Sequence, residues 1–83
     1  MPLFIDIHRD IAGLTGEALE SAHKKDLACG PQHDVKYLRY WFNEHSGSVM
    51  CLVEAPNKEA AIQVHREAHG LVADEIFEVQ EGS

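Results

Sequence analysis

An α+β fold with the element order β-α-β-β-α-β is predicted by three features of the sequence. Apolar runs of strand length occur at residues 3–8, 35–43, 49–54 and 76–80. Two longer segments between them carry small and aliphatic residues at helical spacing, and each ends at a glycine. Four strands and two helices in this order predict one ferredoxin-like domain spanning residues 1–83. We expect an antiparallel sheet in the order 4-1-3-2 with both helices on one face.

The first strand, residues 3–8, alternates an aliphatic face with a face that carries Phe4, Asp6 and His8. The acid and the imidazole are compatible with solvent exposure of this second face. We therefore expect Phe4, which lies on the same face, to be on the open side of the sheet. For the first helix, Thr15 is a suitable N-cap and Gly30-Pro31 is a stop signal. This helix has an apolar stripe that includes Leu27.

The second half of the chain repeats these signals. Residues 35–43 carry aromatic side chains on both faces, which is typical of a strand that is central or covered by a partner subunit. A turn-rich segment at 43–48 predicts a hairpin to the strand at 49–54. Asn57 is suited to cap the second helix and Gly70 to end it. The open sheet face, with its aromatic residues, predicts a face-to-face homodimer.

Composition limits the classes of function. The net charge is −7, from 14 acidic and 7 basic residues, which argues against nucleic acid and anionic membranes as partners. The first residues do not show a signal-peptide pattern. The longest apolar run in the whole sequence, residues 49–53, is too short to span a membrane. Two cysteines without C-x-x-C spacing predict reduced thiols, and we expect a cytoplasmic protein.

Histidines are the most informative residues, because the chain has six of them. His65 and His69 are four residues apart, so both imidazoles project from one helix face. In the predicted topology His69 lies near His8 and the acidic pair Asp74-Glu75, with His65 one turn away. Such a group suits a transition metal. Packed or surface histidines are an ordinary alternative explanation for each residue taken singly.

The first helix carries a further histidine. His23 lies on its inner stripe, from which it could approach His65 across the seam between the helices. Asp26 lies three residues further on, and a packed His23 that bonds to Asp26 is the alternative to a metal ligand.

Catalytic patterns are weak. Cys51 has no spacing that pairs it with a histidine as a nucleophile, and no glycine-rich phosphate loop is present in the sequence. An enzyme is therefore less expected than a binding protein. An alternative from another class is a dimeric α/β-barrel enzyme or binding protein for a small organic ligand or haem. Its pocket would be lined by His23, Tyr40 and Trp41.

Several sequence blocks carry a family resemblance. They are IDIH at 5–8, AH at 22–23 followed by DL at 26–27, CLVEAP at 51–56, and HREAHG at 65–70 ending in DE at 74–75. With these blocks the chain resembles, from Leu3 to Val79, a family of small bacterial nickel-binding proteins long catalogued as a domain of unknown function.

The resemblance implies a ferredoxin-like homodimer that binds nickel, or another divalent transition metal, through histidines and oxygen ligands. Its implied metal residues are His8, His23, His65 and His69, with Asp26 and Asp6 as oxygen donors or outer partners. The expected function is to buffer or sense the metal. Because metal ligation needs neutral imidazoles, binding is expected to weaken below about pH 6.

Overall fold

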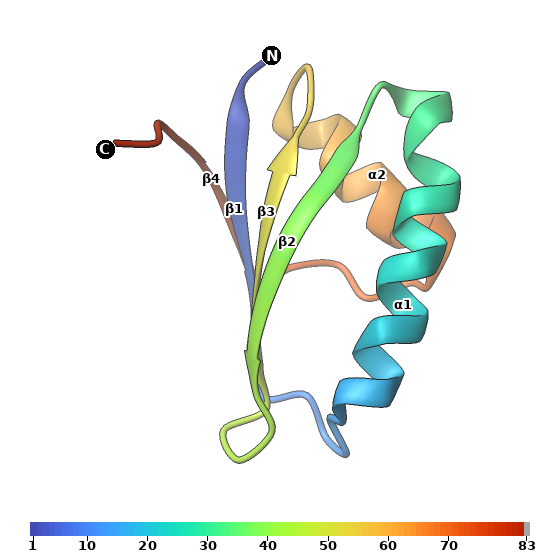
Figure 1. Cartoon of the computed structure of the whole chain (residues 1–83), viewed down its shortest axis with the longest axis vertical. Coiled ribbons are helices and arrows are strands. Elements are labelled where there is room, and N and C mark those ends of the chain that lie inside the picture. Colours follow the sequence, from blue (N-terminus) through green and yellow to red (C-terminus); the bar gives the residue numbers. More distant parts are fainter. Residues whose placement is uncertain (83) are drawn as a thin grey trace.

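The computed structural model describes residues 1–82, and their elements follow the predicted order. The elements are β1 (Leu3–His8), α1 (Gly16–Cys29), the 3-10 helix η1 (Gly30–His33), β2 (Lys36–Asn43), β3 (Ser48–Glu54), α2 (Lys58–Ala68) and β4 (Glu75–Val79). The strands pair antiparallel in the order β2-β3-β1-β4, and both helices cover the same face of the sheet (Figure 1). The predicted ferredoxin-like α+β fold is thereby confirmed.

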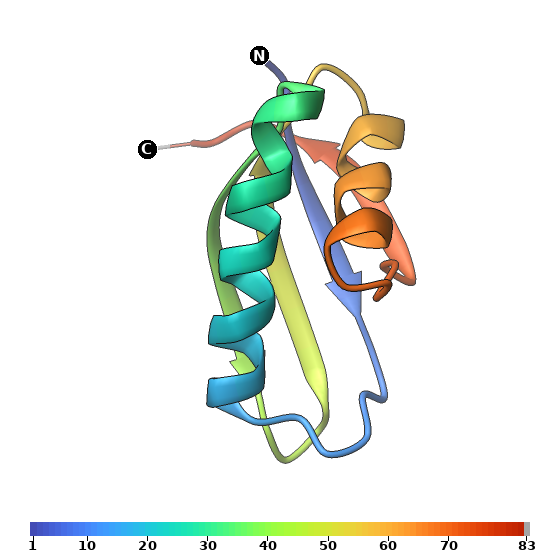
Figure 2. The same ribbon diagram turned by 90° about the vertical axis from the view of Figure 1, so that its right-hand side faces the viewer.

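Local signals in the sequence set the helix ends. The side chain of Thr15 accepts a hydrogen bond from the backbone N–H of Ala18 at 3.1 Å, and Asn57 does the same for Ala60 at 2.9 Å. Gly70, with a φ of +81°, follows the end of α2 in the left-handed conformation that glycine adopts readily. The two helices lie side by side across the sheet (Figure 2).

The first strand faces the opposite way from the expectation. Phe4, Asp6 and His8 point under the helices and are only 5%, 1% and 6% exposed, so the prediction that Phe4 lies on the open side is wrong. Leu27 of α1, expected in the buried stripe, is 44% exposed. The polar face of β1 can be buried because side chains from the helices pair with it, as described below.

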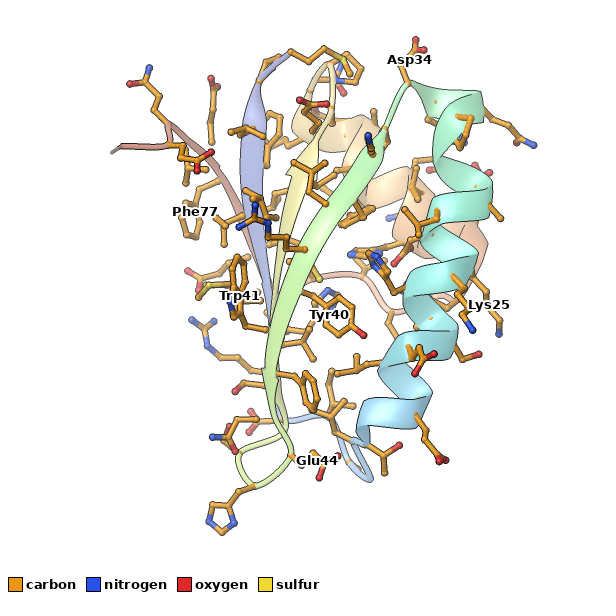
Figure 3. The ribbon with its side chains drawn as sticks, in the orientation of Figure 1. Lys25, Asp34, Tyr40, Trp41, Glu44 and Phe77 are labelled. Carbon is orange, nitrogen blue, oxygen red and sulfur yellow. The ribbon has the colours of Figure 1, made fainter. Side chains whose placement is uncertain are left out.

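A β-bulge changes which aromatic residues of β2 face the helices. The register shifts between Tyr37 and Arg39, so that Tyr37 pairs with Val53 but Tyr40 pairs with Cys51. Both tyrosines therefore lie on the helix side, whereas strict alternation would have separated them. Figure 3 shows Tyr40 pointing toward α1 and Trp41 pointing to the other side of the sheet.

No helix within residues 1–82 is both long and apolar enough to cross a membrane.

Candidate metal centre

Ionisable side chains from three elements meet in the core between the sheet and the helices. β1 contributes Asp6 and His8, α1 contributes Asp26, and α2 contributes His65, with His69 as the residue that directly follows its last turn. Four of these five side chains are buried: Asp6, His8, Asp26 and His65. Charged side chains are rarely buried to this extent unless they are paired or bind an ion. This grouping is therefore the first candidate for a functional site.

His65 lies at the centre of the group. Its Nδ1 is 2.9 Å from Oδ1 of Asp26, and its Nε2 is 3.0 Å from Oδ2 of Asp6. The ring of Tyr37 stacks on the imidazole, with centroids 4.3 Å apart. Burial alone would lower the pKa of His65, but the hydrogen bond with Asp26 and the negative charges of Asp26 and Asp6 raise it to about 9. Without a metal, His65 is thus an imidazolium at neutral pH.

The two carboxylates are held in their ionised form. Burial alone would raise the pKa of Asp6, but its contacts with His65 and His8 lower it well below the usual range. Burial opposes ionisation of Asp26 as well, and contacts with His65 and His69 again lower its pKa. The Tyr37 hydroxyl lies 3.0 Å from Oδ2 of Asp6 and 3.1 Å from the carbonyl oxygen of Ala61, so its single proton is shared between these two acceptors, and the contact helps to hold the Asp6 carboxylate in place.

Two buried polar atoms in this group lack a well-aligned hydrogen bond to any residue in 1–82: Oδ1 of Asp6 and Nε2 of His65. Nε2 of His65 lies 3.0 Å from the other oxygen of Asp6, and Nε2 of His8 lies 3.3 Å from Oδ1. These contacts are close enough for charge attraction but are misaligned for hydrogen bonds. A cation between these atoms would satisfy them, whereas buried polar atoms are normally already paired.

Within the core of the described residues 1–82, two sets of donor atoms that share His65 could hold an ion. One consists of Asp6, His8, Cys51 and His65, and the other of Asp26, His65 and His69; within each set the atoms lie within 4.8 Å of one another. Imidazole nitrogen and carboxylate oxygen suit nickel and zinc. A cavity of about 30 Å³ adjoins both sets, which is room for an ion or one to two waters. The donor types and the available space therefore fit a divalent transition metal.

The structure brings together five of the six residues implied as metal residues. His23 lines the same cavity, but its ring lies against Tyr40 with centroids 4.9 Å apart and belongs to neither donor set. Asp26, expected beside His23, instead bonds to His65 and to His69, whose Nε2 is 3.0 Å from its Oδ1.

Other sequence expectations about this site change as well. Asp74 and Glu75 do not join the histidines but bind Arg9, through its backbone N–H and its guanidinium respectively. Cys51 is buried, as expected of a small apolar residue, yet it lies in a donor set beside Asp6. Burial and the charge of Asp6 raise the pKa of the Cys51 thiol, so it is protonated when no metal is bound. Tyr37 was missed because only the bulge brings its hydroxyl to Asp6.

A ferredoxin-like domain with a buried cluster of histidines and carboxylates is the class of protein that these features define. Residues 4–79 match a family model described as nickel responsive protein SCO4226-like, and the chain belongs to this family. A crystal structure of SCO4226 from Streptomyces coelicolor A3(2) is similar in sequence and fold. Its identity is 40%, its TM-score is 0.90, and the match covers 98% of this chain and 99% of that one. A comparison with curated proteins found no match.

Proposed function

We propose that this chain binds a divalent transition metal, nickel for preference, and buffers or senses it. The observation that carries the proposal is the pair of unsatisfied buried atoms, Oδ1 of Asp6 and Nε2 of His65, within one set of metal-type donors. The description of the family as nickel responsive supports nickel over other ions of similar chemistry.

The contacts suggest different roles for the residues. Asp6, His8 and the Nε2 atom of His65 would hold the ion, with the sulfur of Cys51 as a neighbouring donor. Asp26 would accept a hydrogen bond from Nδ1 of His65, which fixes the tautomer and ring orientation. When bound, the ion would supply a positive charge between Asp6 and His65, whose facing atoms are otherwise misaligned for a hydrogen bond.

His23 is proposed as an additional ligand, but it reaches the ion only if its ring leaves Tyr40. A His23→Ala substitution should therefore weaken nickel binding less than a substitution of His65.

Nickel binding is expected to release protons. His65 is protonated near neutral pH in the metal-free chain, and a metal can bind only its neutral form. Nickel titrated calorimetrically at about pH 7.5, in buffers that differ in ionisation enthalpy, should show saturable binding and release of about one proton per ion from this imidazole. Absence of binding in a protein stripped of metal would reject the proposed function, and binding without proton release would reject His65 as a ligand.

The alternative of a pocket for haem or an organic ligand loses support from the geometry. Tyr40 and Trp41 lie on opposite faces of the sheet and so do not line one pocket with His23 (Figure 3). The cavity that His23 does line, at about 30 Å³, is far smaller than the several hundred Å³ of typical small-molecule sites.

Cys29 and Cys51 are both free thiols. Free thiols are usual in reducing compartments, and on this ground we propose that the protein is cytoplasmic.

We also propose a homodimer formed through the open face of the sheet. On this face, residues paired across the four strands form two neighbouring rows that run from β2 to β4. One row consists of Trp41, Met50, Ile7 and Glu75, and the other of Arg39, Leu52, Ile5 and Phe77. Trp41 and Phe77 are 51% and 45% exposed and point away from the helices (Figure 3). A continuous apolar surface of this kind, with Arg39 and Glu75 at opposite edges, is suited to a second copy related by a two-fold axis.

A Trp41→Glu substitution should convert the dimer to a monomer, because it replaces a large exposed apolar side chain of this surface with a charge that the interface would have to bury. Sedimentation equilibrium measures the mass of each variant. Lys25→Glu adds a carboxylate on the helix side of the molecule, where Lys25 points to solvent, and should leave the mass unchanged (Figure 3). A parent protein that sediments as a monomer at high concentration would contradict the proposal.

A further inference from the structure

A second group of metal-type donors lies outside the candidate centre, at the junction of α1, η1 and α2. It consists of Cys29, His33 and Glu67, whose donor atoms lie within 4.8 Å of one another. Oε1 of Glu67 is central, at 3.1 Å from Nε2 of His33 and 3.7 Å from Sγ of Cys29. Cys29 and His33 are half-buried and Glu67 is exposed, so an ion could enter from solvent.

Local structure fixes these three side chains relative to one another. η1 begins directly after Cys29 and ends at His33. It starts at Gly30, where an added Cβ would clash with the carbonyl oxygen of Val35. No other residue fits there without moving the backbone. On α2, Gln63 donates a hydrogen bond to Oε2 of Glu67 at 2.7 Å, which leaves Oε1 to face the thiol and the imidazole.

We propose that Cys29, His33 and Glu67 form a second metal site, for a thiophilic ion of the zinc type. Thiolate sulfur, imidazole nitrogen and carboxylate oxygen are all zinc ligands, and three protein ligands with a fourth position open to water is the arrangement of many zinc sites. Zinc bond lengths and tetrahedral angles place neighbouring ligand atoms about 3.3 to 3.6 Å apart, with the longer values for pairs that include sulfur. Oε1 of Glu67 lies 3.1 Å from Nε2 of His33 and 3.7 Å from Sγ of Cys29, one slightly below and one slightly above this spacing. For these two pairs of atoms, small side-chain movements would therefore allow zinc to bind.

This site is separate from the candidate centre in both position and chemistry. Glu67 lies between His65 and His69 in sequence but projects outward from α2, whereas His65 is buried. Without metal, burial and the nearby Glu67 carboxylate raise the pKa of Cys29, and its thiol donates to Glu67. Binding would form a metal–sulfur bond and release the thiol proton to solvent.

Cobalt(II) is the probe for this site, because thiolate ligation gives it a charge-transfer band in the near ultraviolet. We expect the band to saturate as cobalt is added to the full chain, and to disappear when zinc displaces the cobalt. Cys29→Ser should abolish the band, and Glu67→Gln should weaken zinc binding by about tenfold or more. All cobalt titrations are made in a Cys51→Ser background, which leaves Cys29 as the remaining cysteine of the chain's two, so that the band reports Cys29 and not the donor set of the other centre.

The experiment separates this proposal from the nickel centre. A His65→Asn variant, which should lose nickel, should keep the cobalt–thiolate band. Zinc should also protect Cys29 of the unsubstituted protein from alkylation, measured on the Cys29 peptide by mass spectrometry, so the outcome does not depend on the folding of a variant. Absence of the band, its persistence in Cys29→Ser, or unchanged alkylation in the presence of zinc would overturn the proposal.

Discussion

Replacing His65 with asparagine is expected to abolish specific nickel binding, with a loss of affinity of at least ~100-fold, since even outer partners of metal ligands contribute 10 to 100-fold. His65 belongs to both sets of donors in the core, so its removal affects an ion on either side of the ring. The substitution also leaves Asp6 and Asp26 facing each other without the positive charge that holds them ionised. Calorimetric titration of nickel measures the affinity directly.

Loss of binding could also follow from unfolding, because removing one partner of a buried ion pair destabilises a protein by about 3–5 kcal/mol. A second variant, Asp6→Asn, tests the same site while His65 keeps Asp26 as a charged partner, and circular dichroism of each variant separates loss of binding from unfolding. The Asp6→Asn substitution keeps the side-chain volume but removes a charged oxygen ligand, so nickel affinity should fall while the far-ultraviolet circular dichroism stays native. His45→Asn, in the exposed β2–β3 turn, is the matched histidine control and should bind as the parent does. Parent-like affinity in a folded His65→Asn protein would exclude His65 as a ligand.

The fold could be predicted because its signals are local. The side chains of Thr15 and Asn57 bond within the first turn of the helix that each precedes, and Gly70 adopts its positive φ next to the helix that it ends. The direction in which β1 faces could not be predicted in this way. Alternation identifies two faces of a strand but not which of them the helices cover. Here the helices cover the face of Asp6 and His8, since Asp6 finds its partner in His65 of α2.

The site was predictable only to the extent that it depends on helical spacing. The four-residue interval between His65 and His69 predicted that both lie on one face of the helix. The helix ends at Ala68, so His69 is its C-cap with a non-helical backbone, yet both histidines contact Asp26. The choice of Asp26 as their partner depends on how α1 packs against α2. Asp26 is separated in the sequence by 39 positions from His65 and by 43 positions from His69, so only the tertiary fold brings them together. The position of Tyr37 depends on a one-residue bulge that the hydrophobic pattern does not reveal.

The metal-free protein is expected to be most stable in mildly acidic solution, between about pH 4 and pH 6.5. The pKa of His65 is raised to about 9 in the folded chain, so its contribution is complete below the unfolded pKa and is lost as the pH rises toward 9. The pKa values of Asp6 and Asp26 are lowered, so their contribution is complete above the unfolded value and is lost in acid.

Denaturant unfolding of metal-stripped protein across this range measures the effect. Between pH 6.5 and pH 9 the free energy of unfolding should fall by on the order of 3 kcal/mol through His65, at about 1.4 kcal/mol per pH unit of pKa shift. A His65→Gln variant should be less stable but should lose most of this slope, whereas His45→Gln should keep it. Equal slopes in the parent and His65→Gln would show that another group titrates.

Nickel should reverse this pH dependence. The metal competes with the proton for Nε2 of His65, so raising the pH removes the proton that stabilises the metal-free protein and frees the nitrogen that the ion needs. The increase in unfolding temperature caused by a fixed excess of nickel should therefore grow from pH 6 to pH 8, while the metal-free unfolding temperature declines. A nickel-induced increase that is constant over this interval would mean that the ion binds groups that do not titrate there. The His65 imidazole would then remain part of an internal ion pair with Asp6 and Asp26 rather than a ligand.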